Sequence, residues 1–422
     1  MNRSWRYARG RRAAATAVAS ALLLVWAAAG CEPPEETGEV GSEEAADAEP
    51  EYRVWAMDQN LDELFVLDPD GGVLDVVGSE ALGGAARPHM LWGVPGDGYV
   101  YSANTVSESV TILDRDSGET LHVIEDVGKA PHAAQPNPVR PDHVYIFNIG
   151  PQEVGEDGEP DRGETLAEVI REGSGSDVTW ELTRYLDLAA SPALADDDLF
   201  PSRRPVCGGF SQDGRHMLVT LFDGGLAVVD LEEWEVTRAW GNDEVAQHGC
   251  GFAPSLDGSE LYVTAGGMES SFLYVFDVAG EEPDLVASHE LSEVGQDAHG
   301  VYVDPVREEL WVLHRVSDNA TIHPLNVIHE AGHDFEEVEF VGSAPDLIAF
   351  SPDGDRAYVS LRGPDPAPTI PHATVGETPG VAILDVETRE LLDVVTLGDL
   401  EDSDFHALFI PESHHGLASQ PQ

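Results

Sequence analysis

Four short runs of β-forming residues recur along this chain with a period of roughly 40 to 50 residues, and no other feature restricts the fold as strongly. The clearest unit reads HMLWGVP, GYVYSAN, SVTILDRDSG and ETLHVIEDV, with Val, Ile, Thr and Tyr inside the runs and Gly, Asp or Asn at their borders. Asp-Gly turns in SQDG, SLDG and SPDG join the first two runs of three further units. Four strands per unit at this period indicate the blades of a β-propeller.

The two ends of the repeat region complement each other. Residues 52–79 supply three strands, YRVWAMD, ELFVLDPDGG and VLDVVGS, with no first strand before them, whereas residues 406–411 supply a first strand with nothing after it. Pairing the two ends completes a seventh blade and removes exposed strand edges. The sequence therefore predicts an all-β, seven-bladed β-propeller over residues 52–412, closed by three N-terminal strands and a C-terminal first strand. We expect it to be a monomer.

Three segments resemble a known repeat. APDLIAFSPDGDRAYVSL, HGCGFAPSLDGSELYVTAGG and PHMLWGVPGDGYVYSAN are similar to the YVTN-type (YncE-like) seven-bladed propeller repeats of bacterial surface and periplasmic proteins. The resemblance covers nearly all of residues 52–412. It implies a fold and leaves the function open.

The chain begins like an exported precursor. Residues 1–30 contain a basic segment, a short apolar run and small residues before Cys31, which is typical of a signal peptide. Ala-Ala-Gly-Cys at 28–31 resembles the bacterial lipobox, with Ala28 where Leu is usual, and implies that Cys31 carries a lipid. Arg11-Arg12 leaves twin-arginine export open as a second route. We expect an extracytoplasmic protein, periplasmic or at the cell surface, held to the membrane by a lipid anchor.

Two further segments flank the propeller. Residues 31–51 are acidic and rich in Pro, Gly and Ala, with almost nothing to bury, so they predict a disordered tether. Residues 413–422 form a C-terminal tail. The chain carries 79 acidic and 22 basic residues, a formal net charge of −57. Because phosphate binding needs a positive field, nucleic acid is excluded as a partner.

One position of the repeat carries chemistry. In six of the seven units a metal-capable or proton-active side chain opens the innermost strand, and the third unit has Val206 there with Cys207 beside it. Equivalent positions in a closed ring point toward one axis, so these side chains should rim one opening. The six residues are His89, His132, His248, His299, Asp346 and His406.

The ends of the second strands should lie on the same face. They add His314 to the possible metal ligands, together with candidate ligand-binding side chains at Asn104, Asn148, Arg315 and Arg362. Asp297 and Asp404 each stand two residues before a ring histidine, where a carboxylate can orient an imidazole that binds a metal.

Three interpretations of the histidines stay open. Neutral imidazoles suit copper, zinc or iron, and three or four nitrogens at about 2.0 to 2.1 Å would hold such an ion. Nitrous oxide reductase also builds a copper cluster on a propeller, but its paired-histidine motif and separate copper domain are absent from this sequence. The imidazoles can instead be structural, each bonding a neighbouring blade. A catalytic acid or base without metal is the third interpretation.

Cys207 and Cys250 stand in the first strands of consecutive repeats with opposite parity, so they can turn toward each other. A disulfide between them would fit an exported protein, although the spacing of neighbouring strands can exceed disulfide reach. The sequence leaves the choice between a disulfide and two thiols open.

The function predicted from these residues is binding of a metal ion, a small ligand or a protein partner in a histidine-rimmed central funnel. The alternative is an enzyme that uses the same funnel, either a copper-type metal-dependent oxidoreductase or a lyase or lactonase. Lactonase-type propellers usually carry a glutamate after the second strand, where this chain has Asn104, Asn148 and Arg362. The sequence does not decide between binding and catalysis.

Overall fold

The computed structural model describes residues 51–154, 158, 161–173, 175–247, 249–304, 306–367 and 374–413. The chain divides into two compact units, Met1–Glu49 and Pro50–Gln422, and the described residues belong to the second. No helix within these ranges is long and apolar enough to cross a membrane. The predicted signal peptide, tether and Cys31, and the tail beyond residue 413, lie outside the described residues.

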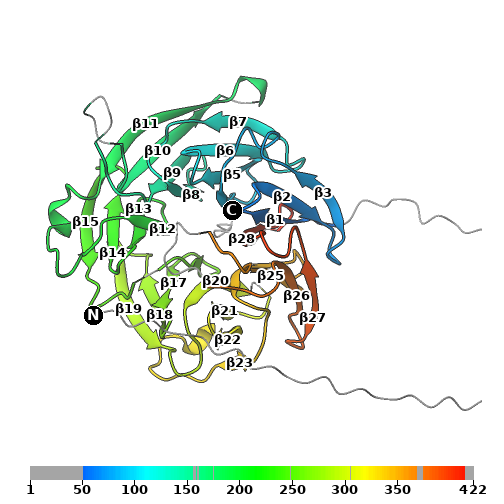
Figure 1. Cartoon of the computed structure of the whole chain (residues 1–422). Helices are drawn as coiled ribbons and strands as arrows, with labels where there is room; N and C mark the ends of the chain where they lie inside the picture. The colour runs from blue at the N-terminus through cyan, green and yellow to red at the C-terminus, as the bar shows by residue number, and fades with distance from the viewer. Residues whose placement is uncertain are drawn as a thin grey trace, which may run out of the picture. The chain divides into compact units, whose positions relative to one another are not determined.

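Seven four-stranded antiparallel sheets form a ring, which confirms the predicted all-β seven-bladed propeller (Figure 1). The predicted closure is confirmed as well, because the last strand β28 (Phe405–Phe409) pairs with β1 (Val54–Asp58). Two further strands, β2 (Glu63–Leu67) and β3 (Val73–Val77), complete that blade from the N-terminal side. One sheet thus ties both ends of the propeller together and leaves no unpaired inner strand.

The other six blades follow in chain order, each built from the innermost strand outward. The second and third blades comprise β4 (Pro88–Trp92), β5 (Tyr99–Asn104), β6 (Ser109–Asp114), β7 (Thr120–Ile124), and β8 (Pro131–Pro136), β9 (His143–Asn148), β10 (Thr165–Glu172), β11 (Thr179–Asp187). The fourth and fifth comprise β12 (Pro205–Phe210), β13 (His216–Leu221), β14 (Leu226–Asp230), β15 (Glu235–Trp240), and β16 (Phe252–Pro254), β17 (Glu260–Gly267), β18 (Ser270–Asp277), β19 (Asp284–Glu290). The sixth and seventh comprise β20 (Ala298–Asp304), β21 (Glu309–His314), β22 (Asn319–Pro324), β23 (Glu336–Val338), and β24 (Pro345–Phe350), β25 (Arg356–Leu361), β26 (Gly380–Asp385), β27 (Leu391–Thr396).

The connections contain little regular structure. The described parts of the connections contain the single-turn 3-10 helices η1 (Gly175–Asp177), η2 (Pro192–Leu194) and η3 (Leu325–Val327). The three predicted Asp-Gly turns form as expected, with Gly214, Gly258 and Gly354 at φ of 69°, 71° and 74°. Glycine adopts these positive dihedrals without a steric cost, so the hairpins between first and second strands close tightly.

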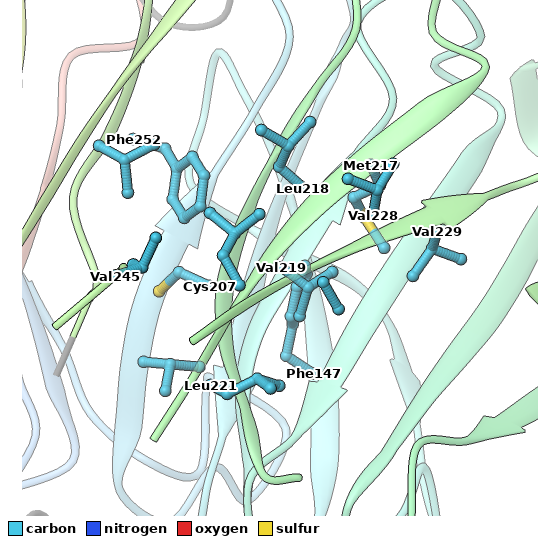
Figure 2. Close-up of a cluster of buried hydrophobic side chains, with 14 of the residues drawn as sticks. Phe147, Cys207, Met217, Leu218, Val219, Leu221, Val228, Val229, Val245 and Phe252 are labelled. Carbon is cyan, nitrogen blue, oxygen red and sulfur yellow. The ribbon is translucent and has the colours of Figure 1, made fainter. Parts of the chain in front are cut away.

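The apolar core lies between neighbouring blades. Figure 2 shows one such cluster, in which Phe147 of β9, Cys207 of β12 and Phe252 of β16 come from three consecutive blades. The middle strands are buried on both faces, as in β13, whereas the outermost strands, such as β3, are exposed. This gradient fixes the innermost strands rigidly in place around the axis.

Candidate functional site

One residue near the start of the innermost strands turns out of its sheet. In β4 the register passes from Pro88, opposite Asn104, to Met90, opposite Ala103, so His89 is left unpaired in a β-bulge. Similar register shifts occur at the starts of β8, β20 and β24. A bulge re-aims the side chain at its extra residue. Each bulge therefore sends the second residue of its strand toward the other blades.

A left-handed backbone residue precedes each of these four bulges by two positions. Arg87, Ala130, Asp297 and Ala344 have φ of 54°, 48°, 62° and 49°. Non-glycine residues seldom adopt this conformation, so its recurrence marks a repeated turn that leads the chain into the innermost strand. The turn and the bulge together place equivalent side chains in one central cluster.

Asp346 is the hub of that cluster. Its carboxylate lies 2.5 Å from His406 Nδ1 and 2.8 Å from His299 Nδ1, and it accepts hydrogen bonds from Arg362 Nη1 at 2.7 Å and Arg315 Nη1 at 3.3 Å. All of these groups are almost fully buried. Burial alone would raise the pKa of Asp346, but His406, His299 and the two guanidinium groups hold it well below the usual range.

His299 is the charged imidazole of the cluster. Burial and the nearby Arg315 oppose its protonation, but Asp346 and Cys250 outweigh them and raise the pKa of His299 to about 9. His406 differs, because burial lowers its pKa below the usual value. The two ring nitrogens of His406 have different partners, because Nδ1 lies against the carboxylate of Asp346 and Nε2 lies 3.0 Å from the sulfur of Met90.

A chain of hydrogen bonds runs from Arg362 to His132. Arg362 donates from Nε and Nη2 to Asp404, at 2.7 and 2.8 Å, and Gln59 Nε2 donates to the same carboxylate at 2.7 Å. Gln59 Oε1 must then accept from His89 Nδ1, 2.7 Å away. The Nε2 atoms of His89 and His132 lie 2.9 Å apart. Burial lowers the pKa of both imidazoles, that of His132 to about 4, so both are neutral.

The chain of hydrogen bonds ends at Cys207 and Cys250. Cys207 Sγ lies 3.6 Å from His132 Nδ1 and 3.0 Å from Cys250 Sγ, and both residues carry free thiols in the structure. Burial raises the pKa of Cys207, whereas the hydrogen bond from Cys207, followed by His299, lowers the pKa of Cys250. The predicted disulfide stays a prediction. The structure brings the two sulfurs and one imidazole nitrogen together at the axis.

Three residues predicted for the central face have partners away from the axis instead, and for His314 one of these partners lies on the preceding blade. The sheet register aligns Asn104, Asn148 and His314 opposite the residue that precedes each axial histidine. Asn104 bonds Ser109 and Thr111, and Asn148 bonds Val127 and Thr165. His314 lies between Ser271 and Thr321, at 3.1 and 3.0 Å. Because side chains alternate along a strand, only the following position, occupied by Arg315 and Arg362, reaches the axis.

The remaining predicted residues have the following places. Arg315 donates to Asp297 at 2.9 and 3.0 Å, so Asp297 and Asp404 each orient a guanidinium group, and Asp404 reaches an imidazole only through Gln59. His248 lies outside the described residues. The cluster therefore contains four of the predicted histidines, two arginines and three aspartates. They are His89, His132, His299, His406, Arg315, Arg362, Asp297, Asp346 and Asp404.

The histidine face is covered by the chain itself. After β25, the backbone amides of Gly363 and Ala367 donate to Asp404, and Thr374 Oγ1 donates to Asp297 at 2.9 Å. The axial imidazoles are at most 3% exposed. They consequently form a buried plug, whereas the sequence predicted the rim of an opening.

The funnel lies toward the far ends of the innermost strands. It has a volume of about 180 Å³ and is walled by five of the seven innermost strands and their flanks. The described lining residues contain no carboxylate and no imidazole, and most are aliphatic or aromatic. They are Met90, Leu91, Trp92, Gly93, Arg115, Cys250, Gly251, Phe252, Ala253, Pro254, Ser255, Leu256, Val301, Tyr302, Val303, Leu347, Ile348, Ala349, Leu408, Phe409, Ile410 and Ser413.

Sequence reasoning missed three parts of this site. Gln59 follows the last residue of β1 and carries no pattern of its own, yet it links Asp404 to His89. Met90 follows a predicted ligand and could have been noted as a soft sulfur donor. The segment after β25 resembles a tolerated insertion, because nothing in its composition marks Thr374 as a cap on the axis.

Comparison with known proteins identifies the fold alone. No protein family and no curated sequence matches the chain. A putative 6-phosphogluconolactonase from Bacteroides fragilis is similar in structure, with 15% identity, a TM-score of 0.59, and coverage of 86% of this chain and 99% of that one. The periplasmic gluconolactonase PpgL of Pseudomonas aeruginosa is similar as well, with 15% identity, a TM-score of 0.58, and coverage of 85% of this chain and 98% of that one. The β-propeller domain of Cps50 (Swd1) from Myceliophteria thermophila has 13% identity, a TM-score of 0.52, and coverage of 72% of this chain and 89% of that one.

Proposed function

We propose that this propeller is a binding protein that takes a small, uncharged and largely apolar molecule into its central funnel. The observation that carries the proposal is a funnel of about 180 Å³ whose walls are apolar and whose floor is closed by the axial plug. Concave apolar sites with few polar groups are the usual form of small-molecule sites. The plug supports the proposal because it fills the axis beside the funnel, where the lining residue Met90 contacts His406 of the plug.

The size and the walls of the funnel define the ligand class. A cavity of about 150 Å³ is known to bind benzene, so the funnel suits a molecule of about one ring with short substituents. Trp92, Phe252 and Phe409 supply aromatic surface to a ring. The strong negative charge of the chain disfavours an anionic ligand.

The chemistry of the walls favours binding over hydrolysis. Opening a lactone needs a general base or an activated water beside the ring. Arg115, the charged residue among the described lining residues, already donates to the carbonyl groups of Val94, Pro411 and Ser413. The likeness to two lactonase-type structures therefore carries no hydrolytic mechanism into this funnel.

The proposal includes the location inferred from the leader. An exported, lipid-anchored propeller held by the acidic segment 31–51 would meet its ligand outside the cytoplasm. Palmitate labelling of cells that express the chain tests this part, and Cys31→Ser should abolish the label. Label retained by that variant would contradict a lipid on Cys31.

Calorimetric titration with neutral one-ring compounds tests the binding itself. We expect 1:1 binding with a negative heat-capacity change, which marks burial of apolar surface. Ala349→Trp places an indole in the funnel and should weaken binding at least tenfold, whereas Ala279→Trp, in an exposed turn, should leave it unchanged. Equal affinities in the two variants would overturn the proposed site. Turnover of gluconolactone, lost in Ala349→Trp, would overturn the choice of binding over catalysis.

A further inference from the structure

A second site lies in the floor of the funnel, where three ligand atoms converge. One imidazole nitrogen of His132 and the sulfurs of Cys207 and Cys250 all lie within 4.8 Å of one another, and all three residues are buried. They come from β8, β12 and the lead-in to β16, so three consecutive blades contribute one ligand each. We propose that these three side chains form a metal site for a thiophilic divalent ion, Zn²⁺ being the best match.

The hydrogen-bond chain prepares His132 as a ligand. The carboxylate of Asp404 can only accept, so Gln59 presents Oε1 to His89, and His89 Nδ1 must carry the proton. His89 Nε2 then accepts from His132 Nε2–H at 2.9 Å. This fixes the tautomer of His132 and leaves the lone pair of Nδ1 directed at Cys207 Sγ. Partners that hold the second ring nitrogen are a regular feature of histidines that bind metals.

The two sulfurs lie close enough to share one metal ion after a small movement. The separation of 3.0 Å exceeds a disulfide bond, about 2.05 Å, and falls short of the roughly 3.8 Å that two sulfurs span when each is about 2.3 Å from one tetrahedral zinc ion. The sulfurs must therefore part by less than about 1 Å. Figure 2 shows Cys207 among apolar side chains, which include Leu221, Val245 and Phe252.

The ligand chemistry selects the ion. Two thiolates and a neutral imidazole are soft or intermediate donors, which exclude Mg²⁺ and Ca²⁺ and suit Zn²⁺ or Cu⁺. Both cysteines bind a metal as thiolates, so their two negative charges are neutralised by a divalent ion and only half neutralised by a monovalent one. Because an uncompensated charge is costly in a buried site, Zn²⁺ is favoured. Cys250 also lines the funnel, which gives the ion a route in and leaves a coordination position toward the funnel.

Zinc titration of the reduced full chain, in a Cys31→Ser background, tests the site. We expect one equivalent of Zn²⁺ to bind, measured by competition with a chromogenic chelator, and Cys207→Ser and Cys250→Ser each to weaken binding at least 100-fold. Co²⁺ in place of Zn²⁺ should show thiolate-to-cobalt charge-transfer absorption. This spectrum is a readout of sulfur coordination that a merely structural role of the cysteines would not produce.

Two control variants show whether zinc binds at these three side chains and independently of the funnel. His314→Gln changes a buried histidine that faces Ser271 and Thr321 and should keep zinc affinity within twofold. Ala349→Trp blocks the funnel above the floor, so it should abolish apolar-ligand binding while equilibrium zinc affinity remains, and the two proposals can fail independently. Three outcomes would each overturn the metal site. The reduced protein could bind no zinc, or Cys207→Ser could bind zinc as tightly as the unmutated protein. After reduction and reoxidation beside excess Zn²⁺, a Cys207–Cys250 disulfide could also form with no metal bound.

Discussion

The innermost strands are polar and charged at their starts and apolar toward their far ends. At their starts, bulges turn His89, His132, His299, Asp346 and His406 into a polar plug that is covered by the segment after β25. Beyond the bulges, β4, β20, β24 and β28 present aliphatic and aromatic side chains to a funnel, which β16 also lines. One extra residue per strand therefore separates a charged centre from an apolar pocket.

The comparison shows how a propeller closes its own axis. A buried charge is tolerated when it is paired and hydrogen-bonded, and Asp346 meets that condition with two guanidinium groups and two imidazoles. The funnel needs no such partners because its walls are apolar. Substitutions of similar size should therefore have unequal effects at the two ends.

The largest effect is expected at Asp346. Asp346→Ala leaves two buried guanidinium groups without their shared carboxylate, and we expect the free energy of unfolding to fall by about 3 to 5 kcal/mol. Urea unfolding at pH 7 measures it. Asp355→Ala is the matched control, because that side chain is 75% exposed and its loss should cost less than about 0.5 kcal/mol.

A loss below about 1 kcal/mol in Asp346→Ala would contradict the role of Asp346 as the hub of the plug. Should the alanine variant fail to fold, Asp346→Asn keeps the shape of the side chain and removes the charge. It should then show an intermediate loss of stability in the same assay.

The second prediction concerns pH and His314, which the sequence placed on the axis and the structure places between Ser271 of one blade and Thr321 of the next. Burial lowers its pKa to about 4, against about 6.5 when unfolded. The unfolded chain thus binds more protons between these values, so the stability from this residue is complete above pH 6.5 and falls as the pH drops toward 4. In His314→Gln the slope of stability against pH should be shallower by up to about 1.4 kcal/mol per pH unit across this window.

Unfolding free energies of both proteins at half-unit steps from about pH 7.5 to about pH 4.5 give the two slopes. Glutamine can still bond Ser271 or Thr321, so the offset between the curves at the highest pH measures packing, and the change in slope measures protonation. Parallel curves would show that His314 is not held neutral in the folded protein.

The sequence predicted the ring well because the repeat is local and its closing strands are visible at both ends. It also predicted that axial residues from distant blades converge, since ring symmetry places equivalent positions together. The sequence did not predict correctly which of two neighbouring residues at the end of the second strand faces the axis. Asn104, Asn148 and His314 precede the axial position by one residue, and the bulges that shift the register have no sequence signature.

The contacts between blades could not be predicted either. Gln59 and Thr374 reach the axis through long-range packing, which no repeat period encodes. The sequence allowed Cys207 and Cys250 to turn toward each other, but the position of His132 beside both sulfurs depends on how three blades pack together.

The smallest effect is expected in the funnel wall, at Leu347 of β24. This side chain is only partly buried, so Leu347→Ala should lower the free energy of unfolding by about 1 kcal/mol or less, because the lost contacts face the open funnel. Leu361 of the same blade is the matched control. Leu361 is fully buried at the end of the blade that carries the plug. Leu361→Ala leaves a cavity there and should lower the free energy of unfolding by about 2 to 5 kcal/mol. Urea unfolding of both variants measures the contrast. Equal losses would mean that the funnel wall packs like a core and is not free to receive a ligand, which would remove the distinction between the two ends.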